Sequence, residues 1–433
     1  MSAPTWSAPS WSSLTWLPEG PPELQEATLT ATWRVGGLVA LAAASERRQL
    51  EAALAALPPG ALAGGLAGYG AGVLVGSGGS TGGRRWCVQP LRHLEASAAA
   101  TAAWLREQGI DPARCLHLDP LPLHHVSGLM PLVRTRCWGA ALRRLPPELL
   151  RQPAALAETC PLPQDKSVLL SLVPTQLRRL LACAAATDWL RRCAVIWVGG
   201  AALPADLASE ARLQGLPLAP CYGATETAAM VCALPPARFL AGEEGCGPPL
   251  NDVELRLDGA TGAVEVRTAR LSPGWLAGAE GVSPLLPEPG GWWRSGDAGR
   301  LEGGGLVVVG RLDGAIHSGG ETVFPEQLEQ RLQRQAIAAG LPLRAVLLLA
   351  EADPEWGERL VALVRPEEAA AAEASGLLQA LAGLTAAWLP AERPRRWLPC
   401  PALEPSAAGK WERGVWRRWL RESGGEQRTV NWS

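Results

Sequence analysis

The chain contains almost no lysine, and one of its two lysines stands in a motif-like segment near the C-terminus. Of 40 lysine and arginine residues, only Lys166 and Lys410 are lysine. Lys410 lies in segment 405–413, which reads Pro-Ser-Ala-Ala-Gly-Lys-Trp-Glu-Arg. A compact ammonium on a flexible stem can enter a crowded site and bridge two oxygens, where a broad planar guanidinium cannot follow. We therefore expect Lys410 to be catalytic, with retention by chance as the alternative.

Glycine and hydroxyl side chains are concentrated in segment 75–85, which reads Val-Gly-Ser-Gly-Gly-Ser-Thr-Gly-Gly-Arg-Arg and lies between an expected strand and an expected helix. Glycines let backbone N–H groups converge on phosphate oxygens, hydroxyls add donors, and the helix would add its positive end. We expect a phosphate-binding loop, with a flexible linker as the alternative. It is no Walker A loop, because Arg84 and Arg85 replace the Lys-Ser or Lys-Thr of that motif. The residues expected to bind phosphate are Ser77, Gly78, Gly79, Ser80, Thr81 and Gly82.

Two of the five histidines, His124 and His125, are adjacent in segment 121–128, after an expected strand. Adjacent side chains usually point in different directions, so we do not expect these rings to share a metal ion. One ring could line a pocket while the other packs or caps. A purely structural pair is the alternative.

Segment 221–227, Cys-Tyr-Gly-Ala-Thr-Glu-Thr, follows an expected strand that ends at Pro220. The Tyr222 ring can stack on a purine, the Thr225 hydroxyl can bind phosphate, and Glu226 can hold Mg²⁺ through its oxygens. In segment 295–297, Ser-Gly-Asp, the carboxylate of Asp297 matches a ribose diol. Segment 310–314, Gly-Arg-Leu-Asp-Gly, follows, and its Arg/Asp pair could equally form a surface turn.

The elements that must hold these motifs alternate between short apolar runs and longer helical patterns, which favours βαβ units and parallel sheets. From about residue 253 strands occur without long helices, as in a small barrel or an antiparallel sheet. We expect a large N-terminal domain over 1–311 and a small α+β domain over 312–433. The expected strands are 72–75, 115–118, 167–172, 194–198, 216–220, 253–257, 263–268, 306–309, 344–350 and 359–364. The expected helices are 91–108, 174–183, 325–339, 367–388 and 410–422.

Composition excludes several classes of protein. A chain of 433 residues is too long to fold around a single hydrophobic core. Its composition, with 47% hydrophobic and 19% charged residues, is typical of a globular protein. A net charge of -2 gives no indication of a surface that binds nucleic acid or anionic membranes. The ten cysteines are scattered, which favours reduced thiols in a cytoplasmic protein and no zinc site. We expect no signal peptide, and no membrane span, because Pro58-Pro59-Gly60 interrupts the uncharged stretch 52–83.

Taken in order, these motifs resemble those of the adenylate-forming superfamily of acyl-CoA synthetases, adenylation domains and luciferases. That family's phosphate loop reads roughly T-S-G-S-T-G-x-P-K, and here the proline is lost and the lysine is Arg85. Its Y-G-x-T-E resembles 222–226, its ribose-binding aspartate Asp297, its G-R-x-D hinge 310–313, and its P-x-x-x-G-K-x-x-R the segment around Lys410. The resemblance covers about residues 70–415.

Within the superfamily, the sequence is most similar to the ligases that join 2-succinylbenzoate to coenzyme A in menaquinone and phylloquinone synthesis. The similar segments are 121–128, 171–177 and 318–321. This chain departs from many relatives at His317. The resemblance implies attack of a carboxylate on the α-phosphate of ATP, then transfer of the acyl group to the thiol of coenzyme A.

The resemblance also implies roles for individual residues. Glu226 would hold Mg²⁺ with Thr225 on the α-phosphate, and Gly223 would belong to the nucleotide site beside Tyr222. Asp297 and Arg311 would bind the ribose. Lys410 would bridge the acid and the α-phosphate, and would enter on a mobile small domain that turns about Asp313. His125 would lie at the acyl pocket.

A second carboxylate on the acid requires a further anchor. We expect Thr175, Arg179 and Gly200 to contact the substrate, with Arg178 beside Arg179, and a solvated basic helix face is the alternative. The other functions left open are another aryl- or acyl-CoA ligase, a non-catalytic adenylate-binding relative, and a module that loads a carrier protein. A homodimer is also left open.

Overall fold

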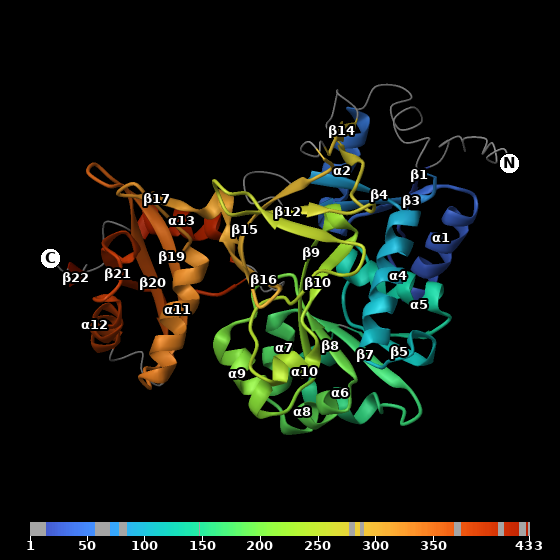
Figure 1. Ribbon diagram of the computed structural model, residues 1–433, viewed down its shortest axis with the longest axis horizontal. Coiled ribbons are helices and arrows are strands. Elements are labelled where there is room, and N and C mark those ends of the chain that lie inside the picture. The colour runs from blue at the N-terminus through green and yellow to red at the C-terminus, as the bar shows by residue number, and fades with distance from the viewer. Residues whose placement is uncertain are drawn as a thin grey trace.

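The computed structural model describes residues 14–56, 70–77, 85–146, 148–276, 282–285, 290–367, 374–405, 411–423 and 430–431. Their strands form four sheets. Three sheets, with their helices, lie in one large part of the molecule, and the fourth lies in a smaller lobe that holds the C-terminus (Figure 1). A mixed α/β fold was predicted, and it is confirmed.

The central sheet has the order β10-β9-β8-β7-β5-β6 and is parallel except at β10, which is antiparallel to β9. Its strands are β5 (Cys115–Asp119), β6 (Ala141–Arg144), β7 (Ser167–Leu172), β8 (Val195–Val198), β9 (Leu218–Ala224) and β10 (Ala229–Ala233). β7 and β8 are nearly continuous apolar runs, because a parallel sheet covered on both faces buries every residue. One face packs on the helices of residues 153–240, and the other packs on the helices of residues 91–138.

Three of the seven helices described around this sheet begin at proline, whose fixed φ suits the first turn. They are α4 (Leu91–Glu107), α5 (Val126–Trp138), α6 (Pro153–Thr159), α7 (Pro174–Leu181), α8 (Ala184–Arg191), α9 (Ala205–Leu213) and α10 (Pro236–Leu240). Short 3-10 turns are η2 (Pro112–Arg114), η3 (Leu149–Arg151) and η4 (Thr225–Thr227).

A second sheet has the order β1-β2-β3-β4-β13-β14. Its strands are β1 (Leu14–Trp16), β2 (Leu38–Leu41), β3 (Gly72–Ser77), β4 (Arg85–Pro90), β13 (Gly274–Leu276) and β14 (Val282–Pro284), with α1 (Pro22–Arg34), η1 (Ala44–Glu46) and α2 (Arg47–Ala55) beside it. The strand β4 corrects one prediction. The glycine-rich segment joins two antiparallel strands, with Ser77 opposite Arg85, and α4 begins only at Leu91. The predicted N-terminus of a helix therefore does not follow the glycine-rich segment directly.

A third sheet, β11-β12-β15-β16, is antiparallel throughout. Its strands are β11 (Glu254–Leu257), β12 (Ala263–Arg267), β15 (Trp293–Glu302) and β16 (Gly305–Arg311). A small barrel or antiparallel sheet was predicted here. The described strands form an open sheet, because its end strands β11 and β16 do not pair with each other.

The fourth sheet follows η6 (Leu312–Gly314) and has the order β18-β17-β20-β21-β22, with β19 paired to β20. Its strands are β17 (Ile316–Ser318), β18 (Glu321–Val323), β19 (Leu343–Asp353), β20 (Gly357–Pro366), β21 (Arg396–Pro399) and β22 (Val430–Asn431). The helices are α11 (Pro325–Ala338), α12 (Ala374–Thr385), η8 (Pro390–Glu392) and α13 (Arg413–Ser423). Leu332, Leu348 and Trp397 lie in its core.

Two helices in this lobe are shorter than predicted. The alanine-rich pattern predicted one helix over 367–388, but Glu367 is not helical and α12 ends at Thr385, whose hydroxyl donates to the Ala382 carbonyl. The second was predicted from Lys410, and α13 begins at Arg413. In the described part of the chain every cysteine is free, and no helix is long and apolar enough to cross a membrane.

Candidate functional site

Residues from two of the predicted motifs meet across the third sheet and the end of the central sheet. The Tyr222 hydroxyl on β9 donates to Asp297 Oδ2 at 2.7 Å. Arg311 Nη1 donates to Asp297 Oδ1 at 3.3 Å, because β15 and β16 pair Asp297 with Arg311. Arg311 also donates to both oxygens of Asp313, at 3.1 and 3.2 Å. A connected polar chain therefore runs from the predicted purine-stacking ring to the predicted hinge.

The turn after Tyr222 is held in a strained conformation. The Thr227 hydroxyl accepts from the Ala224 N–H at 3.0 Å and donates to the Ala229 carbonyl at 2.7 Å. Ala228 and Ala229 both have positive φ, 51° and 76°, which is uncommon without glycine. A Cβ on Gly223 would lie 2.2 Å from the Ala229 carbonyl oxygen. Only glycine fits at this close approach, and it fixes where Thr225 and Glu226 emerge.

Glu226 is buried in this turn and is tied to the end of the glycine-rich segment. The Trp275 indole on β13 donates to Glu226 Oε1 at 3.1 Å, and the Arg85 guanidinium lies over the Trp275 ring, 4.7 Å from its centroid. Gln89 on β4 donates to the Thr225 carbonyl at 2.6 Å. Motif reasoning missed Trp275 and Gln89, because both reach the site through pairing of β4 with β13 and carry no local signal.

The Glu226 carboxylate fits the one-carboxylate mode in which Mg²⁺ binds beside substrate phosphates. Trp275 uses Oε1, and Oε2 has no hydrogen bond within the described residues. The described residues contain no group of three or more His, Cys, Asp and Glu side chains that could hold a metal alone. A metal here would therefore need oxygens from a bound ligand.

Most of the predicted phosphate loop, Gly78, Gly79, Ser80, Thr81 and Gly82, lies outside the described residues. Ser77 is described and buried, and its hydroxyl has no partner among the described residues. β3 and β4 both contact η4, so the two ends of this segment lie against the Thr225–Glu226 turn. The Ser77 hydroxyl and the Glu226 carboxylate therefore both lie near the ends of the glycine-rich segment.

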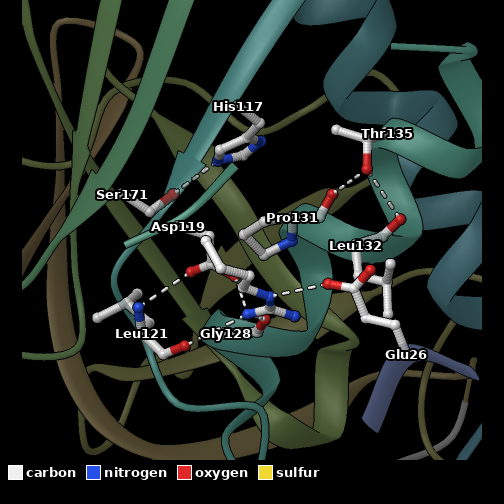
Figure 2. Close-up of polar contacts among 10 residues, drawn as sticks. Glu26, His117, Asp119, Leu121, Gly128, Pro131, Leu132, Thr135 and Ser171 are labelled. Carbon is white, nitrogen blue, oxygen red and sulfur yellow. Dashed lines mark hydrogen bonds and ion pairs between the residues drawn. The ribbon is translucent and has the colours of Figure 1, made fainter. Parts of the chain in front are cut away.

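The loop that carries the two histidines is fastened at both ends by a buried ion pair that motif reasoning also missed (Figure 2). Arg144 Nη1 bonds Asp119 Oδ2 and donates to the carbonyls of Leu121, at 3.5 Å, and Gly128, at 3.2 Å. Its Nε donates to Glu26 at 3.2 Å. The Leu121 N–H donates to Asp119 Oδ1 at 3.0 Å.

His125 occupies the residue before the first turn of α5, and the rings of His124 and His125 pack together with centroids 4.6 Å apart. This differs from the expectation that the two rings point apart. Both rings belong to the short span between Asp119 and the start of α5. The close approach of Gly128 to the Pro122 carbonyl tightens that span further, since a Cβ there would lie 2.2 Å away.

The predicted substrate residues are only partly brought together. Gly200 lies next to Val173, with its ideal Cβ 3.6 Å from Val173 Cγ1, and the buried Thr175 hydroxyl has no partner among the described residues. Arg178 instead forms an ion pair of 2.6 Å with Asp206 on α9. Arg179 is exposed. Of the two arginines on α7, Arg178 is therefore already paired with an acid of α9.

Lys410 lies outside the described residues, and the chain is described again from Trp411. Three residues after Lys410, Arg413 is anchored to α11 and β19. It donates to Glu329 at 2.9 Å and to the Leu348 carbonyl at 2.6 Å, and pairs with Glu326 at 3.1 Å. The Glu326 carboxylate also lies against Gly310, where a Cβ would be 2.8 Å from its Oε2. This links the root of the lysine segment to the strand that leads into the predicted hinge.

Residues 74–271 match the sequence model of the family described as AMP-binding enzyme. A 2-succinylbenzoate–CoA ligase of Escherichia coli (strain K12) is 31% identical over 300 residues, which cover 69% of this chain and 59% of the relative. The chain thus spans about three fifths of the length of the curated relatives that it matches.

Solved structures are similar over more of the chain. E. coli MenE with a bound analogue of OSB-AMS has a TM-score of 0.60 and 27% identity, covering 81% of this chain and 69% of that one. The o-succinylbenzoate CoA synthetase of Bacillus subtilis, in complex with the acyl-adenylate OSB-AMP, has a TM-score of 0.70 and 20% identity. That match covers 96% of this chain and 88% of the other, and it supports the fold.

Proposed function

Because this chain belongs to the adenylate-forming superfamily of AMP-binding enzymes, we propose that it is an AMP-forming acid–thiol ligase that joins 2-succinylbenzoate to coenzyme A. The observation that carries the proposal is the connected chain Tyr222–Asp297–Arg311–Asp313. It joins an aromatic ring that can stack on a purine, a carboxylate that can bind a ribose diol, and the start of the smaller lobe. A nucleotide bound between two moving parts requires this geometry.

In the first half-reaction, a carboxylate oxygen of the acid attacks the α-phosphorus of ATP. The bond to the bridging oxygen breaks, and pyrophosphate leaves. Catalysis here is positioning and stabilisation of charge. Ser77, Gly78, Gly79, Ser80, Thr81 and Gly82 would hold the β,γ-phosphates, and Thr225 the α-phosphate. Mg²⁺ on Glu226 would neutralise charge on the phosphate oxygens. Lys410 would bridge the attacking carboxylate and the α-phosphate.

In the second half-reaction, the thiol of coenzyme A loses its proton and attacks the acyl carbon, and AMP leaves. Lys410 is no longer needed for this step. We propose that residues 312–433 form a mobile domain beside residues 1–311, that they turn about Asp313, and that His125 lies where the acyl site meets the thiol channel. The ion pair of Arg311 with Asp313 supports the pivot, since it couples the ribose-binding residue to the first turn of the smaller lobe.

The experiment measures pyrophosphate release from ATP and Mg²⁺ with 2-succinylbenzoate, benzoate or a medium-chain fatty acid, each with and without coenzyme A. The proposal expects release with 2-succinylbenzoate and sustained turnover only with coenzyme A. If pyrophosphate is released only with another acid, the proposed substrate is wrong. If none of the acids gives release, the proposed ligase activity is wrong. We further propose that the reaction takes place in the cytoplasm within menaquinone or phylloquinone synthesis. Sedimentation would decide between a monomer and the homodimer that the sequence leaves open.

A further inference from the structure

Glu226 is a buried acid with no cationic partner among the described residues. It is 7% exposed, and its carboxylate accepts one hydrogen bond there, from the Trp275 indole to Oε1 at 3.1 Å. An unpaired buried carboxylate is costly, so it is expected where a ligand supplies the missing positive charge. What the fold does supply is a set of contacts that fix the direction of this carboxylate.

Segment 272–275 holds Glu226 at two points. The Ser272 N–H donates to the backbone carbonyl of Glu226 at 2.7 Å, and three residues later the Trp275 indole donates to its side chain. The segment is itself fastened to β4, because the Ser272 hydroxyl donates to the Val88 carbonyl at 2.7 Å. One anchored segment therefore sets both the backbone and the carboxylate of Glu226.

The pairing of β13 with β4 brings a cation to the same indole. Trp275 lies opposite Cys87, so Arg85, two residues away on β4, extends from the same face of the sheet. Its guanidinium lies over the Trp275 ring, 4.7 Å from the centroid, where the electron-rich face attracts a cation. Arg85 is exposed and forms no ion pair with any described residue. A positive and a negative group thus contact one indole without pairing with each other.

The separation matters because an arginine and a divalent cation compete for carboxylate oxygens. A guanidinium pairs with both oxygens of a carboxylate in a fixed fork, and such a pair would leave Glu226 no oxygen for a metal. With the indole between the two charges, Oε1 accepts from a neutral donor, and Oε2 has no hydrogen bond in the described part of the chain. Trp275 therefore leaves one oxygen of Glu226 for a ligand.

We infer that Trp275 is a positioning residue for the metal that accompanies ATP. Its indole N–H orients the Glu226 carboxylate so that Oε2 is presented to a divalent cation, and its ring keeps Arg85 off that carboxylate. The inference rests on the proposed function for the identity of the nucleotide. Two effects of the hydrogen bond oppose each other, since it withdraws charge from the carboxylate and also orients it. Partners that orient a metal-binding carboxylate typically contribute about 10- to 100-fold in metal affinity, so orientation is the larger effect.

The test is calorimetric binding of ATP in Mg²⁺ and in EDTA, without acid or coenzyme A, so that no adenylate forms. The ratio of the two dissociation constants defines the metal preference of each protein. Trp275→Phe keeps a ring for Arg85 but removes the N–H, so this preference should fall by about 10-fold while ATP affinity in EDTA stays that of wild type. Trp275→Tyr, which places a hydroxyl donor on an aromatic ring, should recover part of the preference.

Two further comparisons separate the roles of the N–H and the ring. Trp275→Leu removes both and lets Arg85 reach Glu226, so its preference should fall below that of Trp275→Phe. Adding Arg85→Met to Trp275→Leu should then raise the preference again, because no cation is left to compete for the carboxylate. Glu226→Gln should lose the preference, and adding Trp275→Phe to it should have no further effect, since the indole acts only through that carboxylate.

The matched control is Trp138→Phe, which deletes another indole hydrogen bond, to the Ala98 carbonyl at 3.0 Å, and should keep the metal preference of wild type. The inference is wrong if Trp275→Phe keeps that preference, or if its ATP affinity falls equally in Mg²⁺ and EDTA. If Trp275→Phe does not fold, Arg85→Met decides, since it keeps the indole and should keep the preference, and a lost preference would overturn the inference.

The same proteins distinguish this inference from the proposed ligase activity. A metal preference that depends on Trp275, without pyrophosphate release with any acid, would overturn the ligase and leave the role of Trp275 standing. Pyrophosphate release by wild type, together with an unchanged metal preference in Trp275→Phe, would leave the ligase standing and overturn the role of Trp275.

Discussion

Arg413 holds Glu329 through one nitrogen, with Nη2 donating to both carboxylate oxygens at 2.9 Å. Glu329 in turn accepts the Leu348 N–H at 2.7 Å, and Arg413 Nη1 donates to the Leu348 carbonyl at 2.6 Å. The start of α13 is therefore locked onto α11 and β19 three residues after Lys410. A flexible lysine side chain can return to one position only if the backbone close to it is held rigidly.

Arg413→Met should destabilise the protein and slow adenylation. The change leaves the buried Glu329 carboxylate without its cation, which typically costs about 3–5 kcal/mol in the free energy of unfolding. Urea unfolding followed by tryptophan fluorescence measures the first effect, and pyrophosphate release measures the second. The exposed Arg418 of the same helix gives the control Arg418→Met, which should match wild type. A variant with wild-type stability would contradict the role of the pair.

Lys410→Ala should abolish formation of the acyl-adenylate but leave intact the conversion of supplied acyl-AMP and coenzyme A to thioester. The reason is that the proposed role of the ammonium is confined to the carboxylate and the α-phosphate. The two half-reactions are measured separately by pyrophosphate release and by thioester absorbance. Lys166→Ala is the matched control, since it removes the chain's other lysine, which is exposed. Equal loss in both half-reactions would exclude the assigned role.

Tyr222→Phe should weaken ATP binding by about 10-fold, because it deletes a 2.7 Å hydrogen bond to the Asp297 side chain. The ring remains, so stacking on the base should be retained, and KM for ATP should rise while KM for the acid stays the same. Ser209→Ala removes an exposed helix hydroxyl and serves as the control. An equal rise in both KM values would indicate a general distortion instead.

The sequence predicted the buried scaffold better than the connections within the site. β7 (Ser167–Leu172) was predicted with its observed bounds, because a short apolar run covered on both faces leaves little ambiguity. β4 was missed, because the glycine-rich segment before it was expected to lead into a helix. The tie from Trp275 to Glu226 depends on β13 pairing with β4, which no local pattern encodes.

Acid should destabilise the protein through His93 on α4. Burial, and to a lesser extent Arg92, lower the pKa of His93 from 6.5 to about 4. A folded-state pKa below the unfolded value gives stability that is complete above pH 6.5 and is lost as the pH falls toward 4. Urea unfolding from pH 7 to 4.5 should therefore show a slope that His93→Gln reduces. The exposed His317 supplies the control, His317→Gln, and identical slopes in all three proteins would contradict this source of the pH dependence.

Asp313→Pro should separate the two half-reactions by fixing the pivot. Asp313 lies in η6, between Arg311 and Gly314, and a proline there fixes its own φ and also restricts Leu312. The smaller lobe should then keep one orientation. Pyrophosphate release or thioester formation from supplied acyl-AMP should persist, and the other should fall by at least about 100-fold, since a rotation that positions the reacting groups is blocked.

The control for this pivot is Asp313→Ala, which removes the bonds of 3.1 and 3.2 Å from Arg311 but leaves φ free to change. It should lower both half-reactions by a similar, smaller factor, because it loosens the ribose-binding arginine without trapping the lobe. Both variants lack the Asp313 carboxylate, and only the proline variant restricts the backbone, so the pair distinguishes rotation of the lobe from loss of the contact with Arg311. If the proline variant ran both half-reactions at the rates of the alanine variant, the two parts of the molecule would not need to turn about Asp313, and the pivot would have to be placed elsewhere in segment 310–314.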